Sequence, residues 1–183
     1  MTSLLEYYKE VYGLNEMPDR IDSFRFRNDD QQLNLLDGRE VEKNDAYDGD
    51  FKLYSFTFRR FYKKEGNDVF YNLLESSQPR ICLTHDLYIK DDGVVSKSIW
   101  VSRSMRGIGT HWVRGFILKK YKFIESDSYH TPSGEGFWKR LLEECKKEGF
   151  LCKIVDDNGE SEFNENDFSK YYHSGKTRFR IEN

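Results

Sequence analysis

The chain has few small apolar residues and no long hydrophobic run. Ala46 is the single alanine among 183 residues, whereas aromatic residues make up 16% of the chain. The core must therefore be built from phenylalanine, tyrosine, leucine, isoleucine and valine. No apolar run approaches the roughly 20 residues that a membrane-spanning helix needs, so we expect no membrane partner.

The cysteines are few and irregularly spaced. Cys82, Cys145 and Cys152 are odd in number and show no CxxC spacing, which argues against a zinc site or a disulfide framework. The histidines show no H-x-x-x-H spacing, so no metal site is indicated. The first residues also lack the basic and apolar regions of a signal peptide. We therefore predict a cytoplasmic protein with reduced thiols, in which Cys145 is a core residue.

Charge is distributed unevenly along a chain whose length fits a single domain. Residues 1–50 carry 13 acidic and 6 basic side chains, which favours a solvated acidic face or a partner-binding arm. Val94–Ile124 contains no acidic residue and seven basic ones. The alanine-poor usage, rich in lysine, asparagine and aromatics, indicates an A+T-rich coding sequence, as is common in phages and mobile elements.

The most informative motif lies at Ser104–Thr110, inside the basic stretch. It follows a strand-like run at 98–102 and precedes a helix-like run at 110–121. Glycines let the backbone approach a ligand closely, and the first N–H groups of a helix have no internal partner. The pattern predicts a phosphate site, with a plain glycine-rich connection as the alternative.

The six residues Ser104-Met105-Arg106-Gly107-Ile108-Gly109 resemble the turn Arg/Gln-x-x-Gly-x-Gly/Ala of the GNAT-type N-acyltransferases. In that family the turn follows a central strand and grips the pyrophosphate of acetyl-CoA. Both glycines and the isoleucine match, while Ser104 stands where the family has arginine or glutamine, and Arg106 is a candidate to supply the charge. The resemblance covers about residues 80–156. It implies that acetyl-CoA is bound by Val101, Ser102, Ser104, Arg106, Gly107, Ile108, Gly109 and Thr110.

The resemblance also implies a fold. We expect a mixed α/β (α+β) domain with a GNAT-like central, mostly antiparallel sheet flanked by helices, which splits near Val101. The residue patterns predict a matching order. Strands are expected at 51–62, 69–74, 80–90 and 94–102, a helix at 110–121, a strand at 122–129, a helix from Thr131-Pro132 to Gly149, and a strand at 150–155. An acidic loop at 156–167 and a last strand at 177–181 complete the chain. The N-terminal helix and polar acidic arm extend to Asp50.

A GNAT reaction requires three things of the protein. The acyl carbonyl is held against backbone N–H groups of the central strand, here near 100–102, a proton is removed from the amine, and the thiolate is protonated. The candidate bases are Glu125, Asp127 and His111. The candidate acids are Tyr129, Ser126 and one of Tyr171 or Tyr172.

Each candidate has a structural alternative. Glu125 and Asp127 alternate in phase on a strand, so both would face the same side, and they could be solvated charges at the strand end. His111 lies in the first turn of a helix, where a positive charge is disfavoured, so we expect it to be neutral. His130 could form a Ser/His/Asp set with Ser126 or Ser128, although no nucleophile elbow is present.

The resemblance breaks at one catalytic position. Many family members carry a Phe-Tyr pair whose tyrosine hydroxyl protonates the CoA thiolate, and this chain has Phe137-Trp138. Indole has no titratable hydroxyl. Three functions therefore remain open: an acyl-CoA-dependent N-acyltransferase, a catalytically inactive GNAT-like phage or mobile-element protein that inhibits a host protein, and a nucleic-acid-binding or processing domain. Overall acidity disfavours the third.

Overall fold

The computed structural model describes residues 46–54, 56–76, 81–102, 105, 107–128, 130, 132–170 and 176–183. The predicted N-terminal helix, the arm before Ala46, Ser104, Arg106, Tyr129, Tyr171 and Tyr172 lie outside the described residues. The chain divides into two compact units. The first combines the segment up to His85 with Ile99–Gly109, and the second combines Asp86–Ser98 with Thr110–Asn183.

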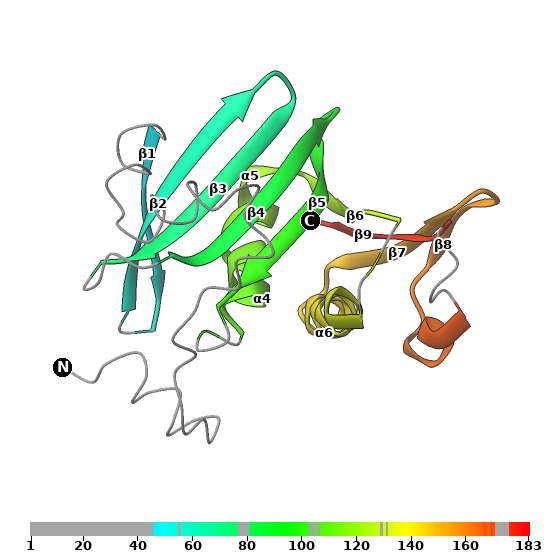
Figure 1. Cartoon of the computed structure of the whole chain (residues 1–183). Coiled ribbons are helices and arrows are strands. Elements are labelled where there is room, and N and C mark those ends of the chain that lie inside the picture. The colour runs from blue at the N-terminus through cyan, green and yellow to red at the C-terminus, as the bar shows by residue number, and fades with distance from the viewer. Residues whose placement is uncertain are drawn as a thin grey trace. The chain divides into compact units, whose positions relative to one another are not determined.

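The described strands form a nine-stranded sheet (Figure 1). Along the sheet the strands hydrogen-bond in the order β1-β2-β3-β4-β5-β6-β9-β7-β8. The pairs β1–β2, β2–β3, β6–β9, β7–β9 and β7–β8 are antiparallel, and β5–β6 is parallel. This confirms the expected mixed α/β class with a mostly antiparallel sheet. The strands are β1 Ala46–Leu53, β2 Phe56–Glu65, β3 Asp68–Glu75, β4 Ile81–Lys90, β5 Gly93–Val101, β6 Phe123–Ser126, β7 Leu151–Asp156, β8 Gly159–Glu162 and β9 Arg178–Glu182.

The predicted strand at 51–62 is two strands in the structure. Tyr54 has a φ of +52° and interrupts the run, so that β1 and β2 form a hairpin. The reason is a change of phase: Phe51 and Leu53 are buried, and the next buried pair, Phe56 and Phe58, is out of step with them. β1 also begins at Ala46, inside the segment that we predicted to be a polar arm.

The hairpin after β2 and the core of the first unit agree with the sequence. β2 and β3 pair directly around Gly66-Asn67, and Gly66 takes a φ of +61° that favours glycine. The turn is therefore tighter than the predicted span of 63–68. In this unit a buried cluster contains Phe61, Leu74, Ile81 and Trp100.

The helical segment after the glycine turn runs from Ile108 to Lys120. It consists of α4 (Ile108–Trp112), a π-helical stretch η3 (Val113–Ile117) and α5 (Leu118–Lys120), so the predicted helix begins slightly earlier than expected. Beyond the first turn, the buried residues of this segment are Trp112, Val113, Ile117 and Leu118. They recur at intervals of five because a π-turn places residues i and i+5 on one face. Phe116 and Tyr121, which lie in the predicted helix, are only half-buried.

The second long helix, α6, spans Pro132–Lys147 and agrees with the helix predicted from Thr131-Pro132 to Gly149. Trp138, Leu141, Leu142 and Cys145 are buried. Gly149 follows the helix with a φ of +89°, and the Phe150 N–H donates to the Cys145 carbonyl at 3.0 Å. These are the features of a glycine-terminated helix.

The C-terminal part differs from the sequence prediction in two places. The predicted acidic loop at 156–167 contains β8 and the start of a 3₁₀ helix, η4 (Glu165–Lys170). Phe168 of this helix stacks on Phe179 of β9, with ring centroids 5.1 Å apart, so aromatic packing orders a segment whose composition is mainly polar. The predicted strand at 122–129 is also shorter, because β6 ends at Ser126.

The thiols provide a first prediction. Cys82, Cys145 and Cys152 are free and buried, and burial raises the pKa of Cys145 to about 12 and that of Cys152 to about 11. Because the thiolate is the reactive form, we expect native protein at pH 8 to react slowly with dithionitrobenzoate. In guanidinium all three thiols should react at once. A rapid reaction of any of these thiols with dithionitrobenzoate in the native protein would contradict their burial.

Candidate functional site

The glycine turn connects β5 to the helical segment. Gly107 has a φ of +87°, in the region that only glycine adopts without strain. It is half-buried, whereas Ile108, Gly109 and Thr110 are buried at the start of α4. The turn therefore has the local backbone that the phosphate motif predicts, and Ile108 is a core residue. The contacts expected from Ser104 and Arg106 stay predictions.

Val101 and Ser102 lie in the stretch near 100–102 that we expected to hold the acyl carbonyl, and their backbone N–H groups point in different directions. The Ser102 N–H donates to the Cys82 carbonyl at 3.0 Å, so it is already engaged with β4. Successive N–H groups of a strand point to opposite edges, so the N–H of Val101 points away from β4. Val101 thus fits the predicted role, and the backbone N–H of Ser102 does not.

β5 and β6 pair over a short length only. Their parallel register joins Val94 to Ile124, Val95 to Glu125 and Ser96 to Ser126. One more hydrogen bond follows, from the Asp127 N–H to the Ser96 carbonyl at 3.1 Å. β6 ends at Ser126, whereas β5 continues to Val101. The pairing of β5 with β6 therefore stops well before the end of β5, nearer to Ser96 than to the predicted position at Val101.

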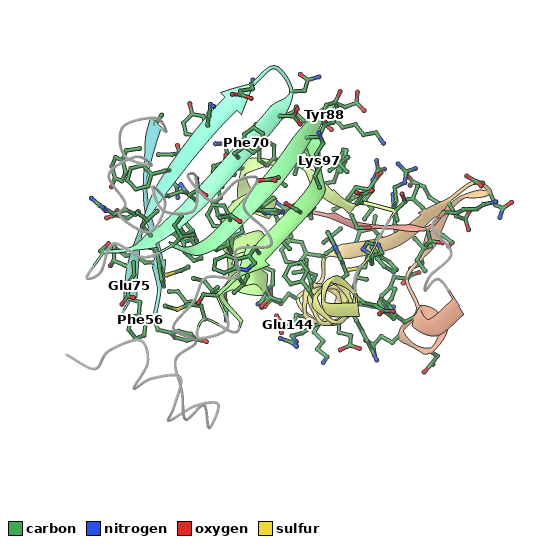
Figure 2. All side chains as sticks on the ribbon, viewed as in Figure 1. Phe56, Phe70, Glu75, Tyr88, Lys97 and Glu144 are labelled. Carbon is green, nitrogen blue, oxygen red and sulfur yellow. The ribbon has the colours of Figure 1, made fainter. Side chains whose placement is uncertain are left out.

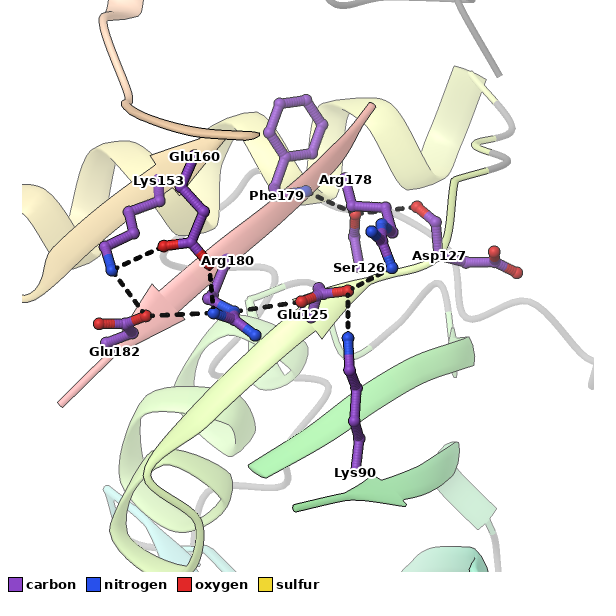
Figure 3. A network of polar contacts seen from close by, with 10 residues as sticks. All are labelled: Lys90, Glu125, Ser126, Asp127, Lys153, Glu160, Arg178, Phe179, Arg180 and Glu182. Atoms are coloured by element: carbon purple, nitrogen blue, oxygen red, sulfur yellow. Dashed lines mark hydrogen bonds and ion pairs between the residues drawn. The ribbon is translucent and has the colours of Figure 1, made fainter. Parts of the chain in front are cut away.

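Glu125 is the centre of a buried ionic network, drawn in Figure 3. Its side chain is fully buried on β6, and Oε2 accepts a hydrogen bond from Arg180 Nε at 3.1 Å. Its Oε1 lies 2.8 Å from Arg178 Nη1 and 3.5 Å from Lys90 Nζ. The solvated alternative is therefore wrong for Glu125. Three cations surround a carboxylate that is shielded from solvent, so it is poorly placed to act as a general base on a substrate.

The network continues across β9 to the neighbouring strands. Arg180 Nη1 also donates to Glu160 at 2.6 Å, and Lys153 donates to Glu160 and Glu182, each at 3.0 Å. These hydrogen bonds raise the pKa of Lys153 and lower that of Glu160. The sequence analysis did not single out these cations. The signal was present in the alternation Arg178-x-Arg180, which places two cations on one face of the last strand.

Asp127 does not share the environment of Glu125. It follows the end of β6 and is half-buried, and its Oδ1 accepts a hydrogen bond from the Ser128 N–H at 2.6 Å. The expectation that both carboxylates face the same side assumed a strand through Tyr129, and β6 is too short for that argument. The side chain of Asp127 organises its own turn.

His111 lies in the helical segment and has the charge state that we expected. Its pKa is lowered, mainly by burial and further by the nearby Arg114, while Glu144 opposes the shift. The neutral form is therefore favoured, although for a different reason from the helix N-terminus. Arg114 donates to Glu144 at 2.8 Å and to Glu148 at 3.0 Å, which joins the helical segment to α6.

A serine–histidine contact lies just beyond β6. The Oγ of Ser126, which is fully buried, lies 3.3 Å from Nε2 of the half-buried His130. Oγ also accepts a hydrogen bond from the Phe179 N–H at 2.8 Å and donates to the Asp127 carbonyl at 2.9 Å. The sequence analysis named this pair only as a minor option. The i,i+4 spacing of Ser126 and His130 at the end of a strand is the sequence signal that would have given this pair more weight.

The neighbours of His130 include Trp138, the residue that the family resemblance would align with the tyrosine. The two rings lie 6.5 Å apart, and the imidazole stacks on Phe179 with centroids 5.5 Å apart. Burial lowers the pKa of His130, and the negative charge of Asp127 acts in the opposite direction. The imidazole is therefore mostly neutral at pH 7, beside an aromatic residue that has no hydroxyl.

The basic stretch is largely occupied by contacts within the protein. Lys97 lies over the Tyr88 ring at 5.1 Å, on the neighbouring strand (Figure 2), and Lys122 pairs with Asp92. Trp100 and Trp112 are buried. They therefore belong to the core and do not provide a platform on which bases could stack.

Within the described ranges, no three His, Cys, Asp or Glu side chains are grouped so that they could hold a metal ion. None of the helices in those ranges combines the length and apolarity that crossing a membrane requires. Comparison of the chain with protein-family models, with curated proteins and with solved structures finds no match to any of them.

Proposed function

We propose that the chain is an acyl-CoA-dependent N-acyltransferase of the GNAT type, acting on an amine acceptor. The observation that carries this proposal is the turn between β5 and the helical segment, where Gly107 has a φ of +87°. A strand, a glycine turn, a helix and a parallel strand follow one another, as the family resemblance requires. The N–H groups at the start of the helical segment are the natural partners of the CoA diphosphate.

The strand after the helical segment adds independent support. The register of β6 with β5 extends over only three residue pairs, although β5 continues to Val101. The Val101 N–H points away from β4 because the neighbouring Ser102 N–H is bonded to Cys82. In this proposal the Val101 N–H receives the acyl carbonyl, and Gly107, Gly109 and Thr110 receive the diphosphate.

The decisive binding test is a calorimetric titration of the full chain with acetyl-CoA, with free CoA and ATP as controls. We expect saturable binding of acetyl-CoA and CoA, and about 2.7 kcal/mol of added stability at a hundredfold excess over Kd. Binding of ATP with equal affinity would indicate a general phosphate site. No binding by any of the three would exclude the acyltransferase proposal.

Substituting Gly107 locates the binding site. In Gly107→Val, a β-branched side chain at a positive φ strains the turn and obstructs the backbone, so acetyl-CoA affinity should fall at least tenfold. Gly149→Val is the matched control, because Gly149 has a nearly identical φ of +89° and open space around it. Calorimetry of both variants measures the loss of acetyl-CoA affinity, and thermal denaturation measures the loss of stability that the strained turn causes. Equal losses of affinity in both variants would contradict the assignment of the turn.

One observation favours the inactive alternative, a GNAT-like protein that binds a host protein. Trp138 is buried and carries no hydroxyl, and Glu125 is neutralised by three cations. Both residues that would most simply serve as acid and base are thus unsuited to those roles. Under this alternative acetyl-CoA either does not bind or binds without turnover, and purification of the full chain from its host would recover a stoichiometric partner.

A further inference from the structure

We propose that the outer edge of β8 is a docking site for an extended segment of another protein that carries lysine or arginine at every second residue. β8 is the last strand in the order of the sheet (Figure 1), and all four of its residues are exposed. Among the strands of the described ranges, β7 is the one that pairs with it. All of the residues concerned belong to the second unit, and the edge is present whether or not the chain binds acetyl-CoA.

The pairing with β7 determines which backbone groups of β8 point outward. The two strands are antiparallel, and just beyond β8 the Phe163 N–H donates to the Cys152 carbonyl at 2.9 Å. The backbone N–H and C=O groups of successive residues in a strand point to opposite edges. Ser161, two residues before Phe163, therefore also faces β7, whereas the backbone groups of Glu160 and Glu162 point away from it. An incoming strand would meet two N–H donors and two carbonyl acceptors.

The side chains along this edge are acidic. Residues 156–167 include six acidic residues and no lysine, arginine or histidine. The side chain of Glu162 is 75% exposed and lies 3.6 Å from Lys146. In the turn before β8, the side chain of Asp157 is 78% exposed and lies 3.9 Å from Lys176. Both distances are too long for a hydrogen bond, so the two carboxylates can bind a cation from outside.

The charge of the edge disfavours a second copy of the chain as the occupant. Two β8 edges paired with each other would place Glu160 and Glu162 opposite the same two glutamates of the other copy. Like charges directly opposite each other destabilise a strand pair, and charged edge strands are one means by which proteins avoid pairing with copies of themselves. A strand that carries cations is attracted at the same positions, so charge complementarity selects a basic partner.

The geometry of a strand sets the spacing of those cations. Residues directly opposite each other point to the same face of a sheet, so side chains at positions i and i+2 of the incoming strand lie beside Glu160 and Glu162. Glu160 is already bonded to Lys153 and Arg180, so Glu162 contributes most of the selectivity. Main-chain hydrogen bonds contribute most of the affinity, as they do wherever an extended peptide adds a strand to a sheet edge.

The open edge can be tested without any partner. In amide hydrogen exchange of the full chain, followed by NMR, the amides of Glu160 and Glu162 should exchange rapidly because they point to water. The amide of Phe163, which is bonded to Cys152, should be protected. Protection of both glutamate amides would show that another part of the chain, or a second copy, already occupies the edge, and it would overturn the proposal.

The binding probe is a capped peptide of alternating threonine and lysine, Thr-Lys-Thr-Lys-Thr-Lys-Thr, titrated into the full chain and followed through amide chemical shifts. In an antiparallel pair, the lysines opposite Glu160 and Glu162 turn their backbone N–H groups toward β8. Methylation of the lysine backbone nitrogens should therefore abolish binding, whereas methylation of the threonine nitrogens, which point away, should preserve it. Equal binding of the two methylated peptides would indicate charge attraction alone and overturn the edge pairing. Failure of the unmethylated peptide to bind would also overturn the proposal.

Two substitutions of Glu162 separate the backbone contribution from that of charge. Glu162→Gln keeps the outward N–H and removes the charge, so affinity for the peptide should fall and should depend less on salt than in the wild type. Glu162→Pro also removes the outward donor, at an edge position where proline is tolerated, so affinity should fall about tenfold or more. Glu165→Gln, which removes an exposed acid of η4 outside the edge, is the matched control, and thermal denaturation verifies that all three variants fold. Unchanged affinity in Glu162→Pro would place the peptide elsewhere and overturn the site.

Discussion

Replacing Arg180 with leucine is expected to lower the free energy of unfolding by about 3–5 kcal/mol. The guanidinium donates to the fully buried Glu125 at 3.1 Å and to Glu160 at 2.6 Å, and it lies 4.2 Å from the centre of the Phe123 ring. Its side chain is only 16% exposed, so water cannot readily replace it. Without Arg180 the buried carboxylate loses its one well-formed hydrogen bond. Urea denaturation monitored by circular dichroism measures the loss.

A double substitution tests whether the lost stability comes from leaving the buried Glu125 carboxylate without its partner Arg180. Adding Glu125→Leu to Arg180→Leu removes the buried carboxylate, so part of the lost stability should return even though a second native residue has been replaced. The same change at the exposed Arg140 should cost less than about 0.5 kcal/mol. If the double variant were less stable than Arg180→Leu alone, packing rather than charge would account for the role of Arg180.

The sequence predicted the middle of the fold well because strong periodicities occur there. Trp138, Leu141, Leu142 and Cys145 repeat at helical spacing, and the helix α6 carries all four on its buried face. The glycine turn was also found from sequence, because a positive φ such as that of Gly107 favours one residue type. In these places local chemistry determines the local structure.

The sequence failed where distant contacts determine the structure. Nothing near Glu125 in the sequence indicates that Arg178 and Arg180, more than fifty residues later, will neutralise it. The segment before Asp167 is polar and acidic, yet β8 forms there because β7 offers it an edge. The end of β6 at Ser126 likewise follows from its partners, and it separates Asp127 from Glu125.

A second large effect is expected from a histidine in the core. His85 lies on β4 between Leu83 and Leu87, and alternation along the strand places all three on the same buried face. Its side chain is fully buried, and burial lowers the pKa of His85 to about 3. Sequence alternation alone would have predicted the inward position of His85.

The burial of neutral His85 makes stability depend on pH. In the unfolded chain the imidazole has its ordinary pKa of about 6.5, so below that pH the unfolded state binds one proton that the folded state does not. The contribution of neutral His85 to the free energy of unfolding is fully present above pH 6.5. It falls by about 1.4 kcal/mol for each pH unit below that, until the pKa of His85 in the folded state is reached. Between pH 7 and pH 5 the loss should be about 2 kcal/mol from His85 alone. His111 and His130, whose pKa values are also lowered, add losses of the same sign.

The pH dependence can be assigned to His85 by comparing how much stability each variant loses between pH 7 and pH 5, rather than the stability of each variant at one pH. His85→Gln and His85→Leu both remove the titrating group, and each also changes the packing and hence the stability at pH 7. In both variants, however, the loss between pH 7 and pH 5 should be about 2 kcal/mol smaller than in the wild type. His130→Gln provides the comparison for a half-buried histidine and should reduce the loss by less. If both His85 variants lost as much stability as the wild type over this range, the imidazole would have to be protonated in the folded protein. A buried cation would then have to be accommodated in the core, which the desolvation cost of burying a charge makes unfavourable.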